Sequence, residues 1–410
     1  MTIRCRLCGA PLQMALVDLG ASPLANSYLS AEGLLGAEIH YPLRPMVCES
    51  CWLVQLPAFE TPEAIFGDYL YFSSFSDSWL THCEELARDL THRLALGSRS
   101  RVVEVASNDG YLLQYFQKAG IPVLGIEPAA NVAKVAQAKG IPTEVRFMGA
   151  ALGQELAAGD RQADLLLGLN VLAHVPDLHD FVEGLQRALA PGGTLVLEFP
   201  HVLELIRGVQ FDTIYHEHFS YLSLIPVERL FREHGLTAFD VQKLPTHGGS
   251  LRFFACHARD GRAAAPSEAL RMLRAEERTA GLDRPDGYQG FAAKVLEIKH
   301  GLLRHLLEAR AEGRRVVGYG APAKGVTLLN YCGVGPDLLP YTVDRSPSKQ
   351  GRYLPGCRIP IRKIEDLLQD RPDEVLILPW NLKNEIVSQM AEVRGWGGRF
   401  SVPIPTLEVL

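Results

Sequence analysis

Short apolar segments alternate with helix-like segments over most of this chain, and this alternation limits the folds open to it. In residues 101 to about 257, strand-like runs such as Arg101–Ala106 and Thr194–Phe199 are separated by helical patterns such as Ala129–Lys139. A second alternation begins with Arg315–Gly318. Strands and helices that alternate in this way form βαβ units, which predict a parallel sheet with helices on both faces. We therefore expect an α/β protein with two such sheets.

The net charge and the hydropathy of the chain indicate which kinds of partner it can bind. The 410 residues carry a formal net charge of −6, which argues against nucleic-acid binding because phosphate recognition needs a basic footprint. Residues 165–173 form the longest strongly apolar stretch, far short of the ~18–20 residues that span a bilayer. We expect a cytoplasmic protein with no nucleic-acid or membrane partner. The oligomeric state stays open, and a monomer is compatible with the sequence.

The first 51 residues hold four of the eight cysteines, as the two Cys-x-x-Cys pairs Cys5 with Cys8 and Cys48 with Cys51. A two-residue gap presents both thiolates to one ion, and two such knuckles complete a tetrahedral four-thiolate zinc site. Because all four positions are filled, the zinc would be structural. The 39 residues between the knuckles predict further folded structure there. The alternative is four buried or redox-active thiols.

A tight corner follows the strand Arg101–Ala106. The run from Val102 to Gly110 resembles the first motif of class I S-adenosylmethionine methyltransferases. The resemblance implies that Glu104, with backbone atoms near Ser107 and Gly110, holds the methionine portion of this cofactor. Glu127 ends the next strand, 23 residues after Glu104, where an acidic side chain accepts ribose hydroxyls. The alternative is an NAD-type or purely structural sheet.

Two later motifs continue this resemblance. The strand Asp164–Gly168 is followed by Asn170 and His174, which is similar to the fourth-strand motif whose loop lies beside the methyl group. Asn170 is accordingly a candidate cofactor ligand. Pro191-Gly192-Gly193 matches the turn before the fifth strand, and it is expected to separate the helix Phe181–Leu189 from that strand. The motifs occur in the order of the superfamily.

Two histidines, a glutamate and two tyrosines are concentrated between Tyr215 and Tyr221, in the run Tyr-His-Glu-His-Phe-Ser-Tyr. An acid–base site fits this composition, since histidine titrates near working pH and Glu or Tyr can orient it. A metal site and ordinary polar core contacts are the alternatives.

Taken over its whole length, the chain resembles the deoxysugar C-methyltransferases, whose C-3-methyltransferases of antibiotic sugar biosynthesis act on TDP-linked 4-keto sugars. The resemblance rests on the N-terminal cysteines, the cofactor motifs and the Tyr-His-Glu-His run. It implies a central class I methyltransferase domain with a Rossmann-like sheet and a second, C-terminal Rossmann-like domain. The residues that match its active site by position are Tyr69, His174, Tyr215, Glu217 and His218.

The chemistry of such a reaction needs a base. A proton next to a ketone can be removed when a base faces it and a donor holds the enolate oxygen. His218 is the favoured base, with Tyr215 or His174 stabilising the enolate, and Glu217 orienting an imidazole or binding a sugar substituent. Glu217 is the rival base, disfavoured because a glutamate of ordinary pKa (~4.3) is a weak acceptor. His216 ranks third, on the premise that alternate residues share a face of an extended segment.

A second Gly-rich corner, Gly318–Gly325, follows the strand at Arg315–Gly318. Its backbone N–H groups near Gly320 and the Lys324 ammonium suit a pyrophosphate. Asp344, at the end of the strand Leu339–Val343, and Lys349 are further candidate substrate ligands. Family resemblance favours a handle for the nucleotide diphosphate over a vestigial fold. We also expect Trp380 and Asn381 to flank the base, and His247–Ser250 to reach the sugar or cofactor.

These observations predict three domains: a zinc module at 1–68, a methyltransferase domain at 69–262, and a nucleotide-binding domain at 263–410. The leading hypothesis is a C-methyltransferase that uses S-adenosylmethionine and a TDP-linked 4-keto-deoxysugar. An O- or N-methyltransferase acting on a related sugar or small molecule is the enzymatic alternative. A zinc-module adaptor without catalysis is the other.

Overall fold

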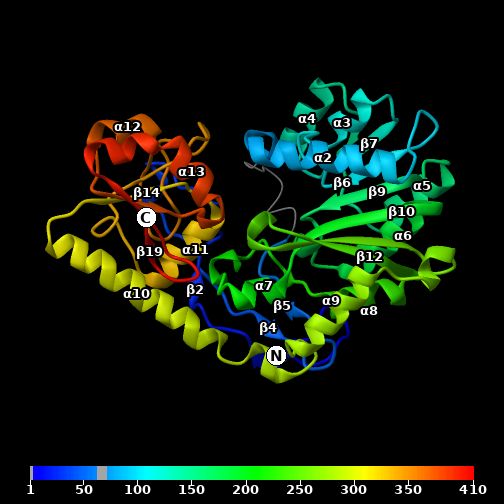
Figure 1. The fold of residues 1–410 in the computed structure, drawn as a ribbon, viewed down its shortest axis with the longest axis horizontal. Coiled ribbons are helices and arrows are strands. Elements are labelled where there is room, and N and C mark those ends of the chain that lie inside the picture. Colours follow the sequence, from blue (N-terminus) through cyan, green and yellow to red (C-terminus); the bar gives the residue numbers. More distant parts are fainter. Residues whose placement is uncertain (1–2, 62–71) are drawn as a thin grey trace.

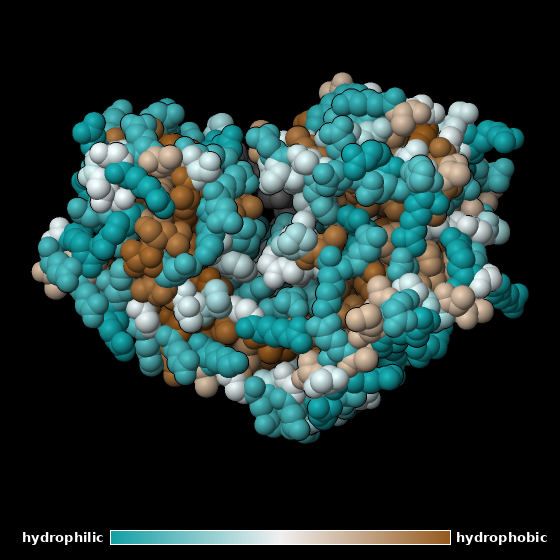
Figure 2. All heavy atoms as spheres, in the orientation of Figure 1, coloured by the Kyte–Doolittle hydropathy of each residue, from teal (hydrophilic) through white to brown (hydrophobic). Residues whose placement is uncertain are grey.

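The computed structural model describes residues 3–61 and 72–410. Two lobes stand side by side, and the N-terminal residues lie beneath and between them (Figure 1). The surface on this side is hollowed between the lobes (Figure 2). Among the described residues, no helix has both the length and the apolar character needed to cross a membrane.

The N-terminal module consists of short strands. β1, β4 and β5 form an antiparallel sheet with β11, a strand contributed by the middle of the chain, while β2 and β3 pair separately. The strand bounds are β1 Met14–Ala15, β2 Ala21–Ser22, β3 Tyr41–Pro42, β4 Met46–Val47, β5 Val54–Gln55 and β11 Ser220–Tyr221. The interval between the two cysteine pairs is folded, as its length predicts.

The central lobe is built on a seven-stranded sheet with the order β12-β13-β10-β9-β6-β7-β8. Counted along the chain from β6, this is 3-2-1-4-5-7-6, the order expected for a class I S-adenosylmethionine methyltransferase. The bounds are β6 Val102–Val105, β7 Val123–Ile126, β8 Thr143–Glu144, β9 Ala163–Leu169, β10 Leu189–Pro200, β12 Leu236–Leu244 and β13 Ser250–His257.

Helices cover both faces of this sheet (Figure 1). Two of them begin at side-chain caps: Ser76 accepts from the backbone N–H of Trp79, and Asp177 accepts from that of Asp180. The bounds are α2 Asp77–Arg93, α3 Leu113–Lys118, α4 Ala130–Ala138, α5 Ala150–Ala158, α6 Leu178–Ala188, α7 Val202–Arg207 and α8 Leu224–Glu233.

The central sheet differs from the prediction in two respects. It is mixed rather than parallel, because β13 runs antiparallel to both β10 and β12. In addition, β10 already starts at Leu189, which pairs with Ala163 ahead of the Pro-Gly-Gly run. That run does not delay the strand; it shifts the register between Leu189 and Thr194.

Two helices, α9 Glu268–Thr279 and α10 Phe291–Ala311, lead to the C-terminal lobe. Its six-stranded sheet has the order β16-β15-β14-β17-β18-β19, parallel except for β19. Counted from β14, this is 3-2-1-4-5-6, a doubly wound Rossmann order. The remaining bounds are β14 Val316–Tyr319, α11 Ala323–Cys332, β15 Thr342–Val343, β16 Ile361–Arg362, α12 Ile364–Asp370, β17 Glu374–Ile377, α13 Lys383–Gln389, β18 Arg399–Val402 and β19 Glu408–Val409.

The N-terminal module shares apolar cores with both lobes. Cys5 and Leu53 pack in the cluster that contains the central sheet. Leu43 and Val54 pack instead with Phe291 of α10 and other residues of the C-terminal lobe. The module therefore packs against both lobes and connects them.

Candidate active site and zinc centre

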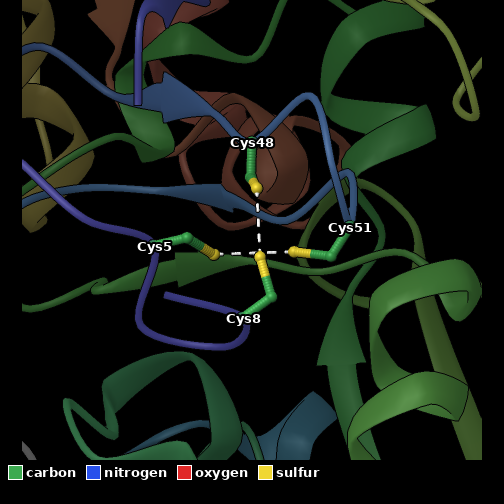
Figure 3. Close-up of side chains that lie close together, drawn as sticks. All are labelled: Cys5, Cys8, Cys48 and Cys51. Atoms are coloured by element: carbon green, nitrogen blue, oxygen red, sulfur yellow. Dashed lines mark hydrogen bonds between the residues drawn. The ribbon is translucent and has the colours of Figure 1, made fainter. Parts of the chain in front are cut away.

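The four N-terminal cysteines converge on one point (Figure 3). Their sulfur atoms all lie within 4.8 Å of one another, and the Cys5–Cys51 and Cys8–Cys48 sulfur pairs are each 3.5 Å apart. Four thiolates at the zinc–sulfur distance of about 2.3 Å would stand ~3.8 Å apart at the corners of a tetrahedron. The four thiols fit a structural zinc ion, as predicted.

The first zinc knuckle also contacts the central lobe. Arg6, between its cysteines, donates to the carbonyl oxygens of Pro176, at 3.1 Å, and of Leu56, and its guanidinium lies 5.4 Å from the ring centre of Phe219. His179 on α6 donates from Nε2 to the carbonyl oxygen of Leu7 at 2.7 Å. The knuckle thus supports the loops that follow β9 and precede β11.

The corner after β6 fits the methionine end of S-adenosylmethionine. Glu104 is fully buried, and neither of its carboxylate oxygens has a hydrogen-bond partner among the described residues. Burial raises its pKa well above the usual range, which the neighbouring Tyr111 hydroxyl partly offsets. The buried Ser107 hydroxyl also has no partner within the described part of the chain. Gly110 has φ +78°, and a Cβ there would lie 2.2 Å from Ile141.

Glu127, at the end of β7, already holds the corner. Its two carboxylate oxygens accept from the backbone N–H groups of Asn108, at 2.9 Å, and Ala129, at 2.8 Å. A carboxylate has about four acceptor sites, so acceptor capacity remains for ribose hydroxyls. Burial raises the pKa of Glu127, and the two backbone donors oppose this rise.

Asn170 stands at the carboxyl end of β9 in a left-handed conformation, with φ +57°. Its side-chain nitrogen lies 3.2 Å from Nε2 of His247, whose ring centre is 5.4 Å from that of Trp79. The segment after β12 therefore reaches the predicted cofactor side of the sheet. Burial lowers the pKa of His247 to about 4.

His174 and His218 lie against each other, with ring centres 4.8 Å apart. Nδ1 of His174 is 2.8 Å from the carbonyl oxygen of Glu217, and Nδ1 of His218 is 2.8 Å from that of Thr213. Because a carbonyl oxygen only accepts, Nδ1 carries the proton in each neutral ring. Burial lowers the pKa of His174 to about 4 and holds that of His218 well below its usual value. Nε2 of His218 is therefore a neutral acceptor, and it has no hydrogen-bond partner in the described ranges.

Tyr215 lies on the same side, with its ring centre 4.0 Å from that of His218. The His218 N–H bonds to the Tyr215 carbonyl at 2.9 Å, so the segment is a turn. The premise of an extended segment is wrong, since this turn brings residues three apart together. His216 instead faces the zinc module, with Nε2 3.2 Å from the carbonyl oxygen of Pro42. Tyr69, predicted from the family, lies outside the described residues.

The Glu217 carboxylate is bound by the N-terminal module. Its Oε1 accepts from Nδ2 of Asn26 at 2.6 Å, and no other hydrogen bond reaches its carboxylate from the described residues. Burial raises its pKa to about 7, while Asn26 and the charge of Lys349 act against this rise. The ordinary pKa assumed from the sequence therefore does not apply to Glu217, and this argument against it as a base is lost.

The second Gly-rich corner is shaped by its own contacts. Gly320 has φ +88°, and a Cβ there would lie 2.6 Å from Pro379. Asp344 accepts from the backbone N–H groups of Ala321, at 2.7 Å, and Ser346, at 2.8 Å. Lys349 donates to the Ala321 carbonyl at 2.9 Å. The predicted substrate ligands of this corner do lie together, but the Asp344 carboxylate is already bound to two backbone N–H groups.

Lys324 extends from the start of α11 toward the central lobe. Its Nζ donates to Oδ1 of Asn381 at 2.8 Å and lies 4.7 Å from the ring centre of Trp380. Trp380 Nε1 in turn donates to Asp212 at 2.7 Å. Burial lowers the pKa of Lys324, and Asp212 opposes this. The positive charge of Lys324 also helps to lower the pKa of His218 and His247, so the second corner and the histidine cluster are electrostatic neighbours.

Sequence reasoning also missed the buried carboxylate of Glu198, which lies beside this site. Glu198 on β10 accepts from Arg252 at 2.6 Å and contacts Nε2 of His82 at 2.9 Å, while its backbone carbonyl accepts from Asn170. The glutamate is 1% exposed. A charged residue inside an apolar strand was the available signal, but its partners stand far away in sequence.

Three family models match successive parts of the chain: a zinc binding domain at residues 5–66, a methyltransferase domain at 79–241 and a C-methyltransferase C-terminal domain at 245–405. One structural neighbour is magnesium protoporphyrin IX methyltransferase from Synechocystis PCC 6803, with a TM-score of 0.36 and 16% identity over 47% of this chain and 91% of that one. Sheet order, cofactor corner and the methyltransferase model together define an S-adenosylmethionine-dependent methyltransferase.

The match to one curated relative covers almost the entire chain. Over 406 residues it is 38% identical to C-methyltransferase NovU of Streptomyces niveus, which is 99% of this chain and 96% of that protein. The chain belongs to this C-methyltransferase family. A ubiquinone biosynthesis O-methyltransferase of Methylobacterium nodulans is 32% identical over only 117 residues, 28% of this chain and 45% of that protein. The extent of the first match favours carbon over oxygen or nitrogen as the acceptor, and an enzyme over an adaptor.

Proposed function

We propose that the chain methylates C-3, next to the keto group, of a TDP-linked 4-keto-deoxysugar in natural-product sugar biosynthesis. The observation that carries this proposal is the half-buried pair His174 and His218, each with Nδ1 bound to a backbone carbonyl. Such a ring offers Nε2 as an acceptor for a carbon-bound proton. Resemblance to the deoxysugar C-methyltransferases supplies the sugar nucleotide.

The chain's residues divide the reaction among them. Nε2 of His218 takes the proton from C-3, and the electron pair of the broken C–H bond moves into an enolate whose oxygen is held by the Tyr215 hydroxyl. Neutral His174 carries its proton on Nδ1, which is bound to the Glu217 carbonyl, so its Nε2 has no hydrogen to donate to the enolate. Glu217 binds a sugar substituent. Glu104, Ser107, Gly110, Glu127 and Asn170 would hold S-adenosylmethionine, which would supply the electrophilic methyl group for C-3 and leave as the demethylated thioether. No metal takes part, and the four-cysteine zinc remains structural.

The nucleotide would be held by the C-terminal lobe. Gly320, Lys324, Asp344 and Lys349 form the corner for the diphosphate. A pocket of ≈ 600 Å³, lined in part by Trp380, Asn381 and Asn384, lies between the lobes, within the usual range for small-molecule sites. Trp380 and Asn381 line this pocket and also contact Lys324, which supports them as flanks of the base. With this assignment, the chain divides into a zinc module at 1–68, a methyltransferase domain at 69–262 and a nucleotide-binding domain at 263–410.

The proposal is tested with a panel of TDP-linked 4-keto sugars, including 3-hydroxy and 3-amino forms, and ¹³C-methyl-labelled S-adenosylmethionine. We expect an enriched methyl resonance coupled to a sugar ring carbon. A labelled methyl attached to oxygen or nitrogen would contradict the proposal, as would the absence of any methylated product from the whole panel.

Replacing Glu127 should weaken cofactor binding. Glu127→Ala removes acceptors for the ribose and also the contacts to Asn108 and Ala129, so we expect a loss of about 1–3 kcal/mol in calorimetric binding of S-adenosylmethionine. Glu155→Ala, at an exposed position of α5, is the matched control. Unchanged affinity in the Glu127 variant would disprove its assignment.

Replacing Lys324 should weaken binding of the sugar nucleotide and leave binding of S-adenosylmethionine unchanged. Lys324→Met removes the half-buried ammonium from the second corner. We expect KM for the sugar nucleotide to rise by ~10-fold or more, since a charge-assisted contact of that kind is worth at least one factor of ten. Cofactor affinity should remain unchanged. Lys294→Met, on the exposed face of α10, is the control. Equal KM values in all three proteins would argue against a diphosphate at Lys324.

A further inference from the structure

A residue of the N-terminal module reaches the catalytic segment directly. Nδ2 of Asn26, which follows β2, donates to Oε1 of Glu217 across 191 positions of sequence, at 2.6 Å. Within the described part of the chain, Asn26 is the sole hydrogen-bond donor to this carboxylate. A buried carboxylate with a single donor depends strongly on that donor for its orientation.

The same turn of chain also touches the second Gly-rich corner. The Tyr28 hydroxyl donates to the carbonyl oxygen of Ala321 at 2.7 Å, and it lies 3.2 Å from Oδ1 of Asn26. Lys349 donates to the same carbonyl, and its Nζ stands 5.1 Å from the ring centre of Tyr28. One short segment therefore links Glu217 to the corner proposed for the diphosphate.

We propose that Asn26 is a positioning residue of the methyl-transfer site, which holds the Glu217 carboxylate toward the substrate and couples it through Tyr28 to the nucleotide corner. The zinc module then has a function beyond stability, because it completes the site that the two lobes leave open. This inference rests on the proposed role of Glu217.

The ionisation of Glu217 gives a readout that a purely structural role would not move. Among residues 3–61 and 72–410, the groups facing its carboxylate are Asn26, Lys349 and Tyr28. An N–H donor stabilises the charged form of a carboxyl group, so its loss raises the pKa, here from about 7. A hydrogen bond to a charged group corresponds to a shift of roughly one pH unit or more.

The experiment is an infrared titration of the carboxyl C=O band in the zinc-loaded full chain without ligands. The band of Glu217 is identified by its disappearance in Glu217→Gln. We expect Asn26→Ala to move the midpoint of this band upward by about one pH unit, while Ser27→Ala, the exposed neighbour, leaves it in place. Asn26→Asp, which preserves the shape of the side chain, should also raise the midpoint, because a second carboxyl group disfavours the charge. The Asn26→Asp variant provides the test if Asn26→Ala does not fold.

Kinetics on the same variants complete the test. We expect kcat of Asn26→Ala to fall ~10-fold, as for loss of one oriented group, with S-adenosylmethionine affinity unchanged because its corner is elsewhere. An unmoved midpoint in both Asn26 variants would overturn the inference. Failure of the proposed function would look different: Glu217→Gln would then retain full activity even though the Asn26 variants still shift the carboxyl band.

Discussion

Replacing His218 with asparagine should lower turnover by roughly 10²–10⁴-fold, the usual contribution of a positioned general base. Asparagine retains a donor for the Thr213 carbonyl, to which His218 Nδ1 is bound at 2.8 Å, so the turn should persist. It lacks the acceptor that Nε2 provides. Both ligands should bind with parental affinity, which calorimetry checks.

The step itself can be observed without methyl transfer. With the cofactor replaced by its demethylated product, the parent enzyme should exchange the sugar's α proton with deuterated solvent, and NMR follows the loss of that resonance. His218→Asn should exchange it far more slowly. His216→Asn is the matched control, since His216 faces Pro42 and the zinc module. Exchange at the parental rate in His218→Asn would remove His218 as the base.

The pH dependence separates His218 from Glu217. A base must be deprotonated to act, so activity falls as pH drops through its pKa. Burial lowers the pKa of His218 well below its usual value, and a profile controlled by His218 should stay flat through pH 7. Burial raises the pKa of Glu217 to about 7, and a profile controlled by Glu217 should fall there. A limb near pH 7 that vanishes in Glu217→Gln would transfer the role of base to Glu217.

Removing zinc should have the second large effect. Structural zinc sites in small modules contribute about 10–16 kcal/mol of apparent binding free energy at neutral pH, and this zinc would join the two knuckles of the module. We expect the parent chain to contain one zinc and Cys5→Ser to lose it. The N-terminal module should then become protease-sensitive and the apparent Tm should fall.

Turnover should fall with the zinc as well, although the four-cysteine site is structural. The Arg6 contacts to Pro176 and Phe219, and the pairing of β5 with β11, support the loops of the site on both sides. Cys357→Ser is the control, because Cys357 lies outside the four-cysteine cluster. Stoichiometric zinc in Cys5→Ser, or its absence from the parent purified without chelator, would contradict the assignment.

The sequence alone determined the local features. Cys-x-x-Cys spacing predicted converging thiols because two intervening residues form a knuckle, and the four sulfurs do converge. The strands and corners at Glu104 and Gly320 were predictable because backbone turns of this kind depend on neighbouring residues. The antiparallel pairing of β13 with β10 and β12 was not predictable. Periodicity does not report the partner of a strand, and β10 lies some fifty residues before β13.

The active site was decided by the tertiary structure. Residue types near Tyr215 indicated acid–base chemistry, but only folding sets the turn that pairs Tyr215 with His218 and directs His216 to Pro42. The protonated nitrogen of His218 and the raised pKa of Glu217 depend on burial and on contacts with residues far away in sequence. Asn26 lies in the zinc module, and no local sequence pattern indicates a role in catalysis. Its contact with Glu217 exists because a shared apolar core packs that module against the two lobes.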